Sequence, residues 1–88
     1  MYYVYILECS DHTYYTGYTT DIACRVKTHN LKKGAKYTRG RLPVTVVYQE
    51  AFIHKTYALQ REYEIKRMTR EQKRQLILQA AQRERSSK

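Results

Sequence analysis

The strongest strand signal in the chain is the segment of residues 44–52, VTVVYQEAF, which is rich in β-branched and aromatic side chains. Residues 2–8, YYVYILE, have the same character, and turn formers at residues 10–12 separate them from a shorter run at residues 13–16. The two N-terminal runs therefore predict a β-hairpin. Because a lone strand needs partners, we expect residues 44–52 to join the hairpin in a three-stranded sheet.

Three helices are expected between and after these strands. Asp21 can cap a helix that begins at Ile22 and ends near Asn30. A second helix is predicted over residues 56–68, and the capping-box pattern TREQ at residues 69–72 opens a third. The predicted order is β-β-α-β-α-α, an α+β fold in which helices flank a small sheet.

The remaining segments are predicted to lack regular structure. Residues 31–43 contain Gly34, Gly40 and Pro43 within a basic run, which is typical of a loop. Residues 81–88 are polar, and we expect them to form a frayed C-terminal tail after a single domain of residues 1–80.

The charge of the chain is strongly positive and unevenly placed. Lysine and arginine number 17 against 8 aspartate and glutamate residues, a formal net charge of +9. Residues 22–49 hold seven basic side chains and no acidic one. Such a segment favours a polyanionic partner, most simply nucleic acid, with an acidic membrane surface as the second candidate and solubility as the plainer explanation.

Other features argue against a membrane protein or an exported one. No stretch approaches the ~20 apolar residues that span a bilayer, and no basic region precedes the apolar N-terminal run as it would in a signal peptide. Cys9 and Cys24 match no metal-ligand spacing. We therefore predict a cytoplasmic protein with reduced thiols.

One glutamate occupies a position where an apolar residue is expected. On a helical wheel, Ala58, Leu59 and Ile65 define the face that packs on the sheet, and Glu62 falls inside that face. A carboxylate there is costly to desolvate unless it is paired. Three explanations are open: an ion pair with a buried arginine, a bound divalent cation, or an acid or base in a cleft.

Arg25 and His29 are four residues apart, so they share one face of the first helix and could contact a phosphoryl group. Each also has a plainer explanation, as a solvated charge for Arg25 and as a response to the helix macrodipole for His29. Hydrolysis of a phosphodiester needs a cation for the developing charge, a base for water and a proton for the leaving oxygen. Glu62, Arg25 and the tyrosines could supply these groups.

Several motifs recur together in a known family. The order YVY at residues 3–5, YTG at residues 15–17, Arg25, and the helical run ALQRE that ends at Glu62 resembles the GIY-YIG nuclease domain. The runs YYVYIL, YTG, HN, KYTRGR and ALxREYxIK resemble the small stand-alone bacterial UPF0213 group. The resemblance extends from about residue 2 to residue 78, and it implies a three-stranded antiparallel sheet flanked by helices.

The resemblance also implies a role for each matching residue. The implied catalytic residues are the two motif tyrosines, an arginine on the scissile phosphate, a histidine where relatives carry tyrosine or histidine, and a metal-binding glutamate: Tyr5, Tyr15, Arg25, His29 and Glu62. Glu62 is implied to anchor a single Mg²⁺ or Mn²⁺, and a motif tyrosine or His29 to help remove the proton of the attacking water. Gly17 closes the second half-motif, and we expect it to let the chain turn toward the helix that presents Arg25.

Three positions depart from the family pattern. Tyr3 replaces a glycine, Thr16 replaces an isoleucine, and Tyr18 stands where excision-repair relatives carry a lysine. Strand alternation points Tyr15 toward the cleft and assigns Tyr14 to packing on the opposite face. Because no separate DNA-binding domain is recognised, affinity must come from the basic loop or from a protein partner.

We therefore predict a divalent-metal-dependent endonuclease on DNA or structured nucleic acid, in DNA repair or processing, with DNA favoured over RNA. The predicted binding residues lie in the basic loop, where one tyrosine is available for base stacking: Lys32, Lys33, Lys36, Tyr37, Arg39 and Arg41. The first alternative is a nucleic-acid-binding module with little activity of its own. The second is an adaptor whose last helix docks a partner through Leu76 and Ile77. A monomer or weak dimer is expected.

Overall fold

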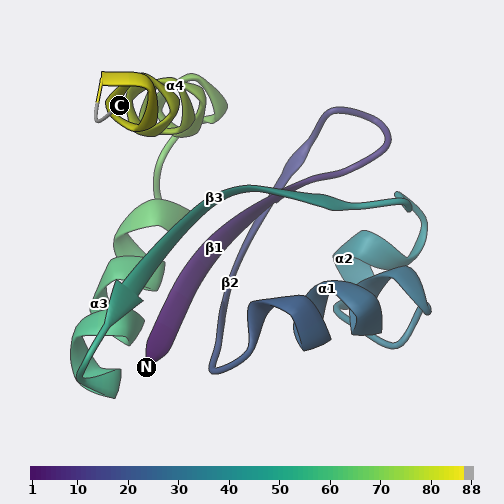
Figure 1. Ribbon diagram of the computed structural model, residues 1–88. Helices are drawn as coiled ribbons and strands as arrows, with labels where there is room; N and C mark the ends of the chain where they lie inside the picture. Colours follow the sequence, from purple (N-terminus) through teal and green to yellow (C-terminus); the bar gives the residue numbers. More distant parts are fainter. Residues whose placement is uncertain (87–88) are drawn as a thin grey trace.

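The computed structural model describes the backbone of residues 1–86 and the side chains of residues 1–82. The elements follow the order β1 (Tyr2–Glu8), β2 (Tyr14–Thr19), α1 (Ile22–Asn30), α2 (Lys36–Arg39), β3 (Thr45–Phe52), α3 (Lys55–Lys66) and α4 (Arg70–Ser86) (Figure 1). The predicted α+β class and element order are confirmed. The short helix α2 is an addition, because it lies inside the segment that was predicted to be a loop.

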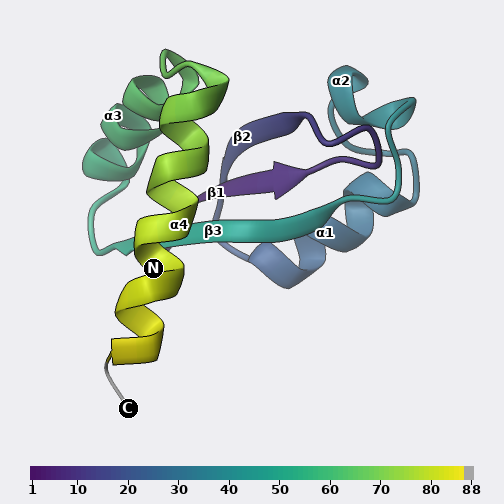
Figure 2. The same ribbon diagram turned by 90° about the horizontal axis from the view of Figure 1, so that it is seen from above.

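The sheet is antiparallel, and its strand order is β2-β1-β3, so β1 lies in the middle and the other two strands form the edges (Figure 2). Tyr5 of β1 lies opposite Gly17 of β2. Between Ile6 and Leu7 the pairing with β3 skips Val47, which is a β-bulge. Helices α1 and α2 lie on one side of the sheet, and α3 and α4 lie on the other (Figure 1).

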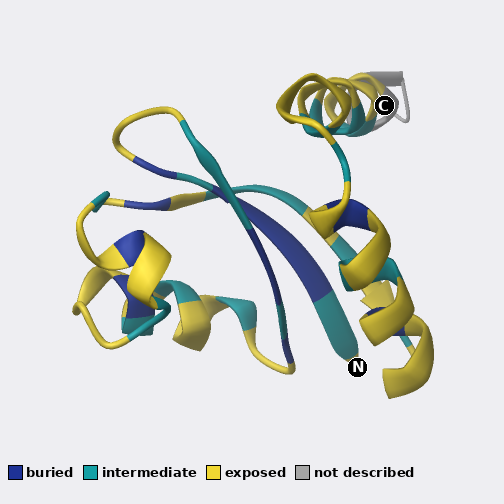
Figure 3. Ribbon diagram, turned by 180° about the vertical axis from the view of Figure 1, so that it is seen from behind, coloured by how far each residue is buried: buried dark blue, intermediate teal, exposed yellow. Residues whose placement is uncertain are grey.

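Side chains of β1 alternate between two cores, one on each face of the sheet, and β1 is the most deeply buried strand (Figure 3). The core on the α3 side is built from Val4, Ile6, Ala58 and Ile65, with Leu76 and Ile77 of α4 packed against it. The core on the α1 side is built from Tyr5, Leu7, Cys9 and Val44, with Ile22 and Val26 packed against it. The predicted role of Ala58 and Ile65 is confirmed, whereas Leu59 is 41% exposed and its predicted core position is wrong.

Side-chain caps confirm two of the predicted helix starts. Asp21 Oδ1 accepts a hydrogen bond from the backbone N–H of Cys24 at 3.0 Å. Thr69 and Gln72 form the reciprocal capping box, with each side chain accepting the backbone N–H of the other at 3.2 and 2.9 Å. Helix α4 runs on to Ser86, through most of the predicted tail, and residues 87–88 lie outside the described residues. None of the helices in the described chain is long and apolar enough to cross a membrane.

Candidate active site

The side chains predicted to be catalytic come from four elements, and the four others each interact with Tyr5, by a hydrogen bond or electrostatically. Tyr5 lies on β1, Tyr15 on β2, Arg25 and His29 on α1, and Glu62 on α3. His29 is within hydrogen-bonding distance of Tyr5. The other three lie close enough to influence the ionisation of the Tyr5 phenol. The fold therefore puts His29 in contact with Tyr5 and the other three within electrostatic reach of it.

A buried chain of hydrogen bonds starts at Tyr5. Its Oη lies 3.3 Å from Nε2 of His29, and Nδ1 of His29 lies 2.8 Å from Oγ1 of Thr38. The Thr38 hydroxyl in turn donates to the carbonyl of Ala35 at 2.9 Å. None of the three side chains is more than 2% exposed. His29 therefore lies inside the protein and not on an open helical face, and its contact with the other predicted residues is through the Tyr5 hydroxyl.

The direction of this chain follows from its far end. Because the hydroxyl proton of Thr38 is given to Ala35, Thr38 Oγ1 accepts the second hydrogen bond. Nδ1 of His29 then carries the ring proton, and Nε2 accepts from the Tyr5 hydroxyl. Burial and the charge of Arg25 lower the pKa of His29, which keeps the imidazole neutral and able to accept this proton.

The ionisation of Tyr5 is strongly disfavoured. Burial, and then the neighbouring Tyr15 phenol, raise the pKa of Tyr5 far above its ordinary value of 10, and Arg25 opposes this only in part. Tyr5 is therefore a neutral phenol near neutral pH, and it cannot serve as a ready-made phenolate base. Any proton that it takes up must be matched by the proton that it gives to His29.

Two glycines make room for this chain. A Cβ atom on Gly17 would overlap the Tyr5 hydroxyl and stand 2.5 Å from Cζ of the same ring. A Cβ atom on Gly34 would overlap Nδ1 of His29 and stand 2.7 Å from its Cγ. Neither glycine has a positive φ. The turn predicted at Gly17 is therefore wrong, because this residue lies inside β2 and leaves space for a side chain.

Arg25 and Glu62 are the charged groups that act electrostatically on the Tyr5 phenol. Arg25 is exposed, and none of the ion pairs between described residues includes it, so its guanidinium is available to a phosphate. The Glu62 side chain is only 19% exposed, and its Oε2 lies 3.2 Å from Nζ of Lys66. The partner of this core-facing carboxylate is thus a lysine on its own helix, and not the buried arginine considered above.

The residues present fit a metal ion that is anchored at one carboxylate. Among the residues whose side chains are described, no three His, Cys, Asp or Glu groups are placed to hold a metal together. Mg²⁺ usually keeps several waters and is bound through one or two carboxylates plus phosphate oxygens of the substrate. Glu62 suits this mode, provided that Lys66 gives up the carboxylate oxygen that the ion takes.

The residues predicted to bind nucleic acid divide into two groups. Four of them are exposed on or before α2 and belong to no ion pair in the described chain: Lys32, Lys33, Lys36 and Arg39. Arg41 is instead engaged within the protein, where it donates to Asp11 Oδ2 at 3.0 Å and to the Tyr37 carbonyl at 2.8 Å. Its guanidinium lies 4.1 Å from the centre of the Tyr37 ring, which also stacks against Tyr15. Both neighbours therefore compete with a nucleobase for that ring.

Some residues of the site were not identified as such from the sequence. Thr38 lies in the run KYTRGR, which belongs to the basic loop, and Gly34 was interpreted only as a residue typical of a loop. A small polar residue at the centre of a basic run was the only available signal for Thr38. Lys66 was visible four residues after Glu62, a spacing that favours an ion pair on a helix.

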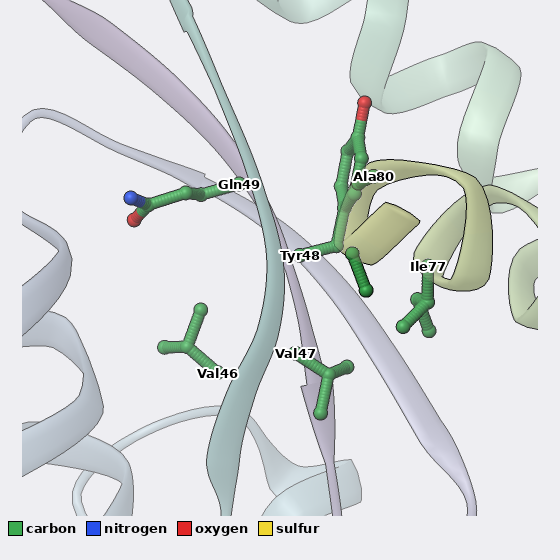
Figure 4. A pocket seen from close by; sticks show the side chains of 7 residues that line it. Val46, Val47, Tyr48, Gln49, Ile77 and Ala80 are labelled. Atoms are coloured by element: carbon green, nitrogen blue, oxygen red, sulfur yellow. The ribbon is translucent and has the colours of Figure 1, made fainter. Parts of the chain in front are cut away.

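A separate hollow of about 420 Å³ lies between β3 and α4 (Figure 4). Val47 and Tyr48 point toward α4, while Val46 and Gln49 point to the other side of β3, which follows from the bulge at Val47. No charged residue lines this hollow, and none of the residues gathered around Tyr5 belongs to it. It is therefore no part of the candidate active site.

Comparisons with known proteins show which family the chain resembles. The family model described as the GIY-YIG catalytic domain matches residues 1–75. A UPF0213 protein of Halobacterium salinarum is 58% identical over 77 residues, which cover 88% of this chain and all of the relative. A UPF0213 protein of Staphylococcus haemolyticus is 56% identical over 75 residues, which cover 85% of this chain and 92% of the relative.

Two solved structures are also similar. The solution NMR structure of a UPF0213 protein from Bacillus halodurans is 54% identical, with a TM-score of 0.57, over 88% of this chain and 83% of that one. The solution NMR structure of a protein from E. faecalis is 38% identical, with a TM-score of 0.62, over 91% and 85% of the two chains. Similarity thus extends over most of each molecule.

Proposed function

Since this chain belongs to the GIY-YIG catalytic domain family, a family of nucleases, we propose that it is a divalent-metal-dependent endonuclease that hydrolyses phosphodiester bonds in DNA or structured nucleic acid. The observation that carries the proposal is centred on the buried Tyr5 phenol, which lies within hydrogen-bonding distance of His29 and feels the charges of both Arg25 and Glu62. The acid-free basic segment supplies the charge that a nucleic-acid substrate requires.

Arg25 and Glu62 have complementary tasks in this proposal. The free guanidinium of Arg25 binds the scissile phosphate through a forked pair of hydrogen bonds and stabilises the charge that develops on it. Glu62 holds a single Mg²⁺ or Mn²⁺, which when bound supplies further positive charge to the phosphate. Tyr15 lies with its ring centre 5.4 Å from that of His29 and closes the site beside the proton acceptor.

The hydrogen-bond chain supplies the base. As Tyr5 takes a proton from the attacking water, it gives its own hydroxyl proton to Nε2 of His29, which becomes an imidazolium ion. The Thr38 hydroxyl keeps Nδ1 protonated throughout and thereby fixes the tautomer that this transfer needs. In this scheme Tyr5 contacts the water, His29 stores the proton, and neither residue has to ionise to an anion.

A cleavage panel tests the proposal. Duplex, nicked, flap and single-stranded substrates are incubated with the protein and Mg²⁺ or Mn²⁺, and we expect at least one to be cut. Glu62→Ala should lower the rate by about 100-fold or more. Glu64→Ala is the matched control, because Glu64 lies on the same helix with a side chain that is 62% exposed. Equal traces of activity in wild type and Glu62→Ala would reject the nuclease assignment.

The second candidate is a binding module that cleaves little by itself, and the four exposed basic residues before and within α2 favour it. Affinity would then fall steeply with salt, by a slope of about 0.9 in log units for each phosphate contact on duplex DNA. Replacing Lys32, Lys33, Lys36 and Arg39 by glutamine should flatten that slope in a fluorescence-anisotropy titration. An unchanged slope would reject this segment as the binding surface.

A further inference from the structure

A second hollow, of about 200 Å³, opens at the edge of the sheet next to the candidate active site. We call it the β2-edge hollow, and its lining residues are Tyr14, Tyr15, Thr16, Tyr37, Lys66 and Lys73. None of them is acidic, and all of them carry a hydroxyl or ammonium group that can donate a hydrogen bond. Tyr15 is shared with the candidate active site, so the two places are contiguous.

Two lysines line this hollow. Burial and then the charge of Lys66 lower the pKa of Lys73, so the two ammonium groups act on each other and that of Lys73 is partly withdrawn from water. Lys66 has Glu62 as a partner, whereas no ion pair between described residues includes Lys73. Two neighbouring cations with a single carboxylate between them leave one positive charge without a counter-charge.

Thr16 adds an independent sign of a missing ligand. It is 3% exposed, and its Oγ1 is the only buried side-chain oxygen or nitrogen among the described residues that has no hydrogen-bond partner. An unpaired buried hydroxyl is unfavourable, and such groups commonly mark a place that an ion or ligand completes. Thr16 lines the same hollow as the two lysines.

We propose that the β2-edge hollow binds a backbone phosphate of the nucleic-acid strand next to the phosphate that is cleaved, with Lys73, Lys66 and the Thr16 hydroxyl as its contacts. The inference rests on the proposed function, because it concerns the same substrate. A phosphate oxygen accepts from every lining group, and lysine is a common point-charge ligand for phosphate. The ion pair between Lys66 and Glu62 joins this subsite to the candidate metal position.

Lys73 and Thr16 are the residues to test, since a change at Lys66 would also release Glu62. Binding of a labelled duplex is followed by fluorescence anisotropy in EDTA, so that no cleavage occurs. Lys73→Gln should weaken binding about tenfold and lower the salt slope by about 0.9. Thr16→Val, which keeps the side-chain shape, should weaken binding about fivefold without changing the slope. Lys55→Gln removes an exposed charge from the other end of α3 and should change neither quantity.

Three results would overturn the subsite. The first is a Lys73→Gln titration that matches Lys55→Gln. The second is wild-type affinity in Thr16→Val, with a thermal midpoint that shows an intact fold. The third is an NMR titration in which inorganic phosphate shifts the Lys73 signals while the oligonucleotide does not. Cleavage by wild type is measured separately. If wild type cleaves but the binding experiments reject the subsite, only this inference is refuted. If affinity depends on Lys73 but wild type does not cleave, only the nuclease proposal is refuted.

Discussion

Replacing Gly17 by alanine tests whether the space over Tyr5 is needed by the fold. The new Cβ atom would stand 2.5 Å from Cζ of the Tyr5 ring, whereas an ordinary carbon contact needs about 3.5 Å, so the ring must move by about 1 Å. That ring is 2% exposed and packed in the core on the α1 side. The same movement would break its hydrogen bond to His29, which is already 3.3 Å long.

Overpacking of this kind costs about 1–3 kcal/mol of unfolding free energy. For a domain of this size each 1 kcal/mol lowers the thermal midpoint by about 4–8 °C. We therefore expect Gly17→Ala to unfold at clearly lower urea concentration and temperature than wild type, as measured by circular dichroism. We also expect nuclease activity to be lost at temperatures where the variant is still folded, because the hydrogen bond from Tyr5 to His29 is broken.

Gly40→Ala is the matched control for this substitution. No atom lies within 4 Å of a Cβ placed on Gly40, and its backbone φ of −96° is accessible to alanine. A change of at most about 1 kcal/mol, in the stabilising direction, is expected there. The reasoning fails if Gly17→Ala is as stable as wild type within about 0.5 kcal/mol, or if Gly40→Ala loses as much stability.

Two further predictions concern the same buried chain. Because the folded pKa of His29 lies below its ordinary value of 6.5, the unfolded chain binds a proton first as the pH falls below 6.5. The free energy of unfolding should therefore decrease as the pH falls through that window and then level off. Between pH 7.5 and 5.5 the urea midpoint should drop more in wild type than in His29→Gln, and parallel curves would contradict this. Thr38→Val leaves Nδ1–H of His29 without an acceptor and should lower the free energy of unfolding by about 1–3 kcal/mol. The NMR shifts of the His29 ring nitrogens should report a changed tautomer. An unchanged ring spectrum would refute the assigned direction of the hydrogen-bond chain.

The sequence predicted the elements well where local chemistry decides them. Asp21 and the capping box at residues 69–72 act within one helical turn, so their residue types alone fix the helix starts. Leu59 was misplaced because periodicity shows which residues are apolar but not which of them the sheet covers, and this side chain is exposed. The one-turn helix α2 is too short to carry any periodic signal.

The candidate site was reached in a different way. The set from Tyr5 to Glu62 followed from a resemblance to motifs at characteristic separations; in the structure His29 contacts Tyr5, and Tyr15, Arg25 and Glu62 influence it electrostatically. The depth of His29 was not foreseeable, because it depends on Thr38 and Gly34 packing against the ring from a segment that looks like a loop. Gly17 shows the same difficulty, since a glycine that gives space and one that allows a turn are identical in sequence.

In the proposed mechanism, the contact of Gly34 and Thr38 with His29 couples substrate binding to proton transfer. The stretch from residue 32 to residue 41 presents its lysines outward and at the same time forms the wall that sets the histidine tautomer. Exchanging this stretch between relatives is a way to change substrate preference. Such an exchange would alter the pH dependence of the proposed reaction unless Gly34 and Thr38 were kept. A loop that is grafted into this fold should therefore keep Gly34 and Thr38 and vary only the residues around them.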